Sequence, residues 1–111
     1  MTTATTAPMT ITDEAAARID ELGLRSHFET MIEHLRQVVP DLLRIEVEAQ
    51  WDPCERELCR IMIWAYRPPH LDPYMDDPTN RNWVEWIIQA FPPEVFMHFV
   101  MSCAYEAENG R

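Results

Sequence analysis

The side chains of this chain that could carry out chemistry are four histidines, three cysteines and the acids of a proline-rich loop. These residue types supply most metal ligands and most general acids and bases in proteins. Which of these uses the chain permits depends on how the residues are spaced and on the elements that hold them.

Two of the histidines, His27 and His34, lie seven residues apart in a segment with helical periodicity. Seven residues place two side chains on one helix face but separate them by about 10.5 Å along the axis, too far to share a metal ion. We expect both to be surface or boundary residues. His98 follows Glu94 by four residues, which predicts an exposed i,i+4 pair. A general acid–base role for His98 needs a nucleophile or second carboxylate nearby.

The cysteines, Cys54, Cys59 and Cys103, form no CxxC pair, and their number is odd. Together with His70 they could supply the thiolate and imidazole ligands of a zinc site. Cys59 and Cys103, however, fall among aliphatic residues, where a thiol behaves as a small hydrophobic group. We therefore predict no metal site and no cofactor, and a reduced, cytoplasmic protein.

The segment 67–82 holds four prolines and the acids Asp72, Asp76 and Asp77. These carboxylates could bind a hard cation, but EF-hand spacing and its glycine turn are absent, so a solvated acidic loop is expected. Phosphate-loop, GxSxG, HExxH and dinucleotide motifs are also missing from the sequence. This disfavours an enzyme without excluding one, because catalytic carboxylates or a single histidine leave no local signature.

The composition indicates a single domain with its own core, since 47% of the 111 residues are hydrophobic. The formal net charge is −10 and lysine is absent, so we expect no nucleic-acid binding, which needs clustered positive charge. No apolar run approaches the ~20 residues of a membrane span, so no membrane partner is expected. Residues 1–11 are predicted to be a disordered lead-in, 12–108 the domain and 109–111 a tail.

The elements that position these residues are organised around a predicted β-hairpin. From Leu43 to Trp51, apolar residues alternate with charged or polar ones, as in a strand with one buried face. The second strand, Leu58 to Tyr66, is apolar on both faces, so we expect it to be covered on both faces and to lie in the middle of the sheet. The turn between them contains Asp52 and Pro53, which end the first strand.

The flanking segments complete the predicted fold. Apolar spacing of three and four predicts a helix over 13–38, ended by Pro40 and open to a break at Gly23. Residues 83–91 fit helical spacing, but their Trp, Val and Ile content favours a third strand. A last helix is predicted from Pro92 onward. The expected class is α+β, helix–strand–strand–strand–helix, a small antiparallel sheet packed by two helices, with αββαα as the alternative if 83–91 is helical.

The strongest functional signal is a surface. If the hairpin buries one face, Met62, Trp64 and Tyr66 lie on the other, beside Arg44 and Arg60. Protein interfaces are enriched in these residue types. We predict a small acidic protein that acts by protein–protein interaction, as an adaptor, inhibitor or immunity-type partner, or as a homodimer. The alternatives are that a helix covers this face as ordinary core, and that the chain is an enzyme or ligand-binding domain using loop 67–82 and His98.

Overall fold

The computed structural model describes residues 7–51, 54, 59–68 and 78–105. Its elements follow one another in the order β1 Met9–Ile11, α1 Asp13–Leu22, α2 Arg25–Val38, β2 Arg44–Trp51, β3 Cys59–Arg67, α3 Thr79–Ala90, α4 Pro93–Phe96 and β4 Phe99–Tyr105.

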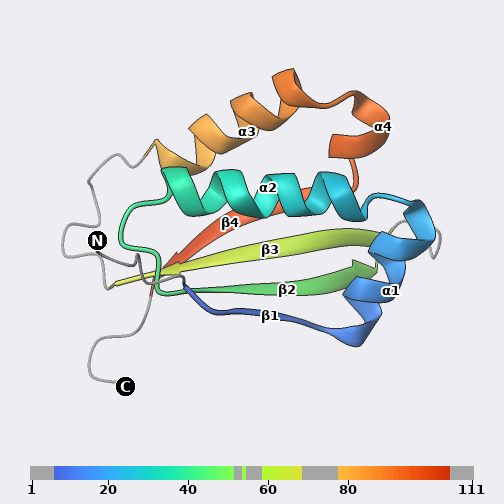
Figure 1. Ribbon diagram of the computed structural model, residues 1–111, viewed down its shortest axis with the longest axis horizontal. Helices are drawn as coiled ribbons and strands as arrows, with labels where there is room; N and C mark the ends of the chain where they lie inside the picture. Colours follow the sequence, from blue (N-terminus) through green and yellow to red (C-terminus); the bar gives the residue numbers. More distant parts are fainter. Residues whose placement is uncertain (1–6, 52–53, 55–58, 69–77, 106–111) are drawn as a thin grey trace, which may run out of the picture.

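The strands form one mixed sheet in the order β1-β2-β3-β4 (Figure 1). β1 is parallel to β2, β2 is antiparallel to β3, and β3 is parallel to β4. Parallel neighbours need a long crossover, and each pair has one built from two helices. The domain is therefore α+β and consists of two strand–helix–helix–strand halves joined at the β2–β3 hairpin. The sheet is not purely antiparallel, as the sequence had suggested.

The central hairpin is confirmed. In its register Ile45 faces Ala65 and Val47 faces Ile63, so the alternating aliphatic residues of both strands share one face. Ile45, Ile61 and Ile63 are fully buried there. The prediction that the second strand lies in the middle of the sheet is also confirmed, since β3 is hydrogen-bonded to β2 on one edge and to β4 on the other.

The predicted break in the first helix is confirmed at Gly23. This residue adopts φ 71, a left-handed conformation that glycine reaches without a side-chain clash. Leu24 N–H donates to the Ile19 carbonyl at 3.0 Å, which closes the end of α1 before α2 begins. At the other end, the Thr12 hydroxyl accepts from Ala15 N–H at 3.1 Å and caps α1.

The prediction of a strand over 83–91 is wrong, because Thr79–Ala90 forms α3. Trp83 and Ile87, four residues apart, are the two buried positions of this helix. Burial at helical spacing outweighs the strand preference of Trp, Val and Ile, which mainly reflects fit to a half-buried pleated surface.

The prediction of a last helix from Pro92 onward is also wrong. Only Pro93–Phe96 is helical, and Phe99–Tyr105 forms β4. Phe99 and Met101 are buried whereas Val100, between them, is exposed, which is the period of a strand. β4 supplies the second neighbour that β3 needs, in the place that the sequence had assigned to 83–91.

The lead-in prediction fails for Met9–Ile11, which pairs with Ile45–Val47 as edge strand β1. The folded part thus begins before residue 12. Residues 1–6 and the predicted tail, 109–111, lie outside the described residues. In the described part of the chain, no helix is long and apolar enough to cross a membrane.

The core is one hydrophobic cluster between the helices and one face of the sheet. In Figure 1, α2 runs in roughly the same direction as the strands, with α3 beside it. The buried strand residues of this cluster alternate along each strand, and are Ile45, Val47, Ile61, Ile63, Ala65, Phe99 and Met101. We call this side the inner face and the opposite side the outer face.

Candidate functional site

The outer face is the side of the sheet on which no described helix packs. Its residues come from the three long strands and alternate with those of the inner face, and are Arg44, Glu46, Glu48, Gln50, Arg60, Met62, Trp64, Tyr66, Val100, Ser102 and Ala104. All five residues predicted to bind a partner therefore lie together on this face.

The apolar part of the outer face follows β3. Met62 is 9% exposed and belongs to no part of the helix-packed core cluster, while Trp64 and Tyr66 are half-buried. In the register of β3 and β4, Val100 lies beside Met62 and is 36% exposed. Met62 is therefore largely buried, and the accessible apolar surface comes from Trp64, Tyr66 and Val100.

The two aromatic residues are held by charged residues on β2. The Arg44 guanidinium carbon lies 3.8 Å from the centroid of the Tyr66 ring, within cation–π range. Arg44 Nε also donates to Glu46 Oε2 at 2.8 Å. Trp64 Nε1 donates to Glu48 Oε1 at 3.0 Å. These contacts fix the ring orientations and satisfy the indole N–H, so both rings present a defined surface.

The outer face differs in charge from the helical layer. It carries two arginines, Arg44 and Arg60, and two glutamates, Glu46 and Glu48, so its formal charge is zero. The four helices together carry eight acidic residues and four arginines. The outer face is thus close to neutral on a chain whose net charge is −10.

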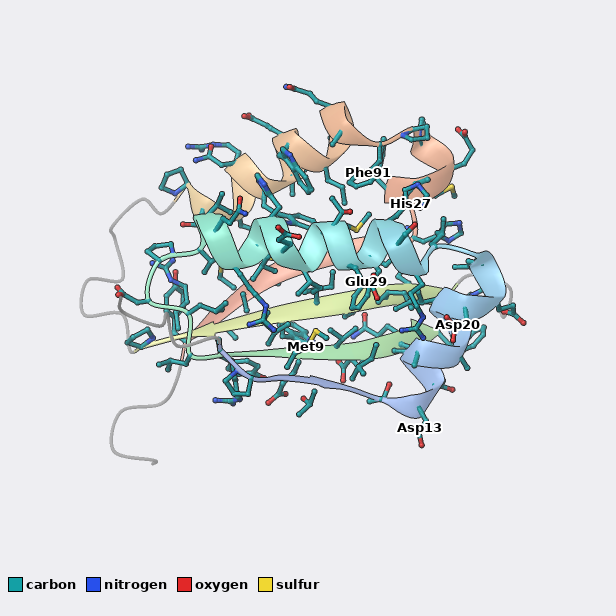
Figure 2. The ribbon with its side chains drawn as sticks, viewed as in Figure 1. Met9, Asp13, Asp20, His27, Glu29 and Phe91 are labelled. Carbon is teal, nitrogen blue, oxygen red and sulfur yellow. The ribbon has the colours of Figure 1, made fainter. Side chains whose placement is uncertain are left out.

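The histidines of α2 lie where the sequence placed them, at a boundary. His34 stacks on Trp86 of α3, with ring centroids 3.7 Å apart, and His27 meets the edge of Phe91 at 5.5 Å. Figure 2 shows His27 beside Phe91, at the seam between α2 and the α3–α4 connection. Burial lowers the pKa of His34. The two histidines therefore stabilise packing between helices.

In the alternative site, built from loop 67–82 and His98, the start of the loop at Arg67 and His98 lie at opposite ends of the sheet, and residues 69–77 lie outside the described residues. β3 and β4 are parallel, and Arg67 faces Tyr105 at the end where the loop begins. His98 precedes β4 at the other end, seven residues or about 23 Å away. Burial, and to a lesser degree the charge of Arg18, lowers the pKa of His98. Its expected helical pair with Glu94 is absent, since α4 ends at Phe96.

The cysteines are also separated. Cys59 pairs with Trp51 at one end of the sheet, whereas Cys103 pairs with Ala65, about 20 Å further along β3. Burial raises the pKa of the Cys59 thiol, which disfavours the thiolate that binds metals. Among the described residues, no three His, Cys, Asp or Glu side chains lie close enough to hold a metal ion. The remaining candidates, His70, Asp72, Asp76 and Asp77, lie outside the described residues.

The sequence did not predict a cleft of about 250 Å³ between β1 and α2, lined mainly by apolar atoms of Met9, Phe28, Glu29, Ile32, Glu33 and Arg36. Figure 2 shows Met9 and Glu29 near the middle of the view, below α2. Arg36 also donates to the Ala7 carbonyl, which ties the segment before β1 to α2. The helical pattern of α2 gave no sign of the cleft because its other wall is a strand that the sequence did not reveal.

Comparison with known proteins gives no match, whether with protein-family models, curated proteins or solved structures. The function must therefore be argued from the geometry of this chain.

Proposed function

We propose that this protein acts by binding another protein chain through the outer face of its sheet. The observation that carries the proposal is the position of Met62, Trp64 and Tyr66 on β3, opposite the helix-packed core. A central strand that is apolar on both sides is usually covered on both sides. Here the described helices pack on one side only, so a partner would supply the missing cover.

The residue types on the outer face support a protein partner. Aromatic residues, methionine and arginine are enriched in protein interfaces, and binding energy concentrates in tryptophan, tyrosine and arginine. Trp64 and Tyr66 are already oriented by Glu48 and Arg44, so little side-chain freedom would be lost on binding. The cleft lined by Met9, Phe28 and Arg36 lies on the helical side of the sheet, away from this face.

Other partner classes fit less well. Nucleic acid needs clustered positive charge, whereas Arg44 and Arg60 are balanced by two glutamates on the same face. A membrane-binding surface would also be expected to carry excess basic residues. The role that fits is that of a small acidic adaptor, inhibitor or immunity-type protein. The odd number of cysteines and the lack of a CxxC pair favour action in a reducing compartment, which is part of this proposal.

Site-specific photo-crosslinking in the native host tests the proposal. A photoreactive residue placed at position 64 should form crosslinked products with protein. The matched control is the same residue at Ile88, which is 52% exposed on α3. Products specific to position 64 would support the proposal. Equal products at both positions, or none at either, would reject it.

A second test asks whether the aromatic residues are interface or core. Replacing Trp64 and Tyr66 together by serine should abolish the products formed from a photoreactive residue at Val100, which faces Met62. The melting temperature of the variant should remain near that of the parent. Loss of the fold would show that the aromatic residues belong to the core, and the proposal would fail.

A further inference from the structure

We infer that the chain bound on the outer face is a second copy of this protein, which forms a two-fold symmetric dimer through its sheets. The inference rests on the proposed function and names its partner. It is carried by the charge of the outer face and by the placement of that charge in the strand register, while the size of the face limits the strength of the dimer.

The charge argument compares the outer face with the rest of the chain. With a net charge of −10, two copies repel each other in most orientations. The outer face is the exception, because Arg44 and Arg60 balance Glu46 and Glu48. A strongly basic or strongly acidic partner would find no matching potential on a neutral face, whereas an identical face offers both signs.

The register places these charges so that two copies can complement each other. Glu46 and Glu48 lie at the middle of β2, while Arg60 lies on β3, opposite Gln50 and nearer the hairpin turn. Two sheets can pack with their strands nearly at right angles. With a two-fold axis between Trp64 and Met62, this packing sets Arg60 of one copy over Glu46 and Glu48 of the other. The symmetry repeats the contact, and the apolar residues of β3 meet at the axis.

The size of the face allows only a weak dimer. Three strands of eight, nine and seven residues make a surface of about 25 Å by about 15 Å. Because the strands of the two copies cross nearly at right angles, the faces overlap over about 15 Å by about 15 Å and bury on the order of 500 Å² in total, below the size of stable interfaces. The dimer should therefore dissociate on dilution.

Sedimentation velocity over a concentration series provides the first measurement. The purified full chain should shift from monomer to dimer as concentration rises. Glu48→Arg and Arg60→Glu should each raise the dimer dissociation constant by about tenfold or more, because each sets like charges against each other. Glu85→Arg, an equal charge change on exposed α3, is the matched control and should leave association at least as strong as in the parent.

Mixing the two charge variants is the decisive experiment. In a mixed pair, Arg at position 48 of one copy meets Glu at position 60 of the other, and the second contact keeps its native charges. An equimolar mixture should therefore dimerise about as well as the parent chain. Glu48 and Arg60 are also diagonal neighbours within one sheet, but a change confined to one chain cannot be rescued by mixing.

Two results would overturn the inference. One is a parent chain that stays monomeric at every concentration, and the other is a pair of charge variants that mixing does not rescue. If position 64 still crosslinks specifically to a different protein, the proposed function stands and only the identity of the partner is wrong. If the parent is monomeric and position 64 forms no specific product, both the inference and the proposed function fail.

Discussion

The two faces of the sheet are made from alternate residues of the same strands, yet the core cluster that includes the helices lies on only one of them. On β3 the inner face presents Ile61 and Ile63, which are 0% exposed beneath the helices. One residue further along, the outer face presents Trp64, half-buried and held by Glu48. Both faces of β3 are apolar, so hydrophobicity alone does not distinguish a core from an interface. The helices determine which face forms the core, and the face that they leave uncovered is the one that we propose binds a partner.

The largest expected effect is on the inner face. Ile61→Ala should lower the free energy of unfolding by about 2–5 kcal/mol, because truncating a fully buried isoleucine leaves a cavity. Urea denaturation measures the change, and Arg60→Ala, on the other face of the same strand, is the control. A loss under about 1 kcal/mol for Ile61→Ala would mean that the inner face is not the core.

The double change Trp64→Ser, Tyr66→Ser should cost less, about 2 kcal/mol or under in total. It removes half-buried rings together with one hydrogen bond and one cation–π contact. Thermal melting follows stability and sedimentation velocity follows association, which should fall. A cost equal to that of Ile61→Ala, with association unchanged, would erase the proposed distinction between the two faces.

The edge strand β1 repeats the comparison on a smaller scale. Ile11 packs against the core cluster, whereas Thr10, facing Glu46, is exposed on the other side. Ile11→Ala should therefore cost about 1 kcal/mol or somewhat more. Thr10→Ala should change stability by about 0.5 kcal/mol at most. Chemical denaturation measures both free energies of unfolding. If neither substitution changes stability, Met9–Ile11 does not contribute to the fold and is a lead-in as the sequence predicted.

The smallest effect concerns pH and the helical layer. Burial lowers the pKa of His34 and His98 in the folded protein, so the unfolded chain binds protons first as pH falls. Their contribution is fully present above the unfolded pKa of about 6.5 and declines below it. The melting temperature should therefore fall slightly between about pH 7.5 and about pH 5.5. The decline should be shallower in His34→Gln, and identical slopes would contradict this. The hydrogen bond with Arg25 lowers the pKa of Asp20, so this carboxylate affects the melting temperature only at more acidic pH.

The sequence by itself determined those parts of the fold in which burial is one-sided. Alternation in Arg44–Trp51 and three- to four-residue spacing in Arg25–Val38 each match a single period, so strand and helix were predicted correctly. The same alternation placed Arg44, Arg60, Met62, Trp64 and Tyr66 on one face, because period two follows from strand geometry alone. The break at Gly23 was also readable, since glycine is costly inside a helix.

Only the tertiary structure decided the segments that are apolar on more than one side. Trp83–Phe91 and Phe99–Tyr105 fit both periods, and their states were predicted in reverse. β4 is a strand because the neighbouring strand β3 supplies its backbone hydrogen-bond partners. α3 is a helix because this conformation buries Trp83 and Ile87 together. A short apolar segment adopts whichever period lets its neighbours bury it and satisfy its backbone groups, and those neighbours are distant in sequence. The contact of Trp64 with Glu48 likewise joins residues 16 apart and exists only in this strand register.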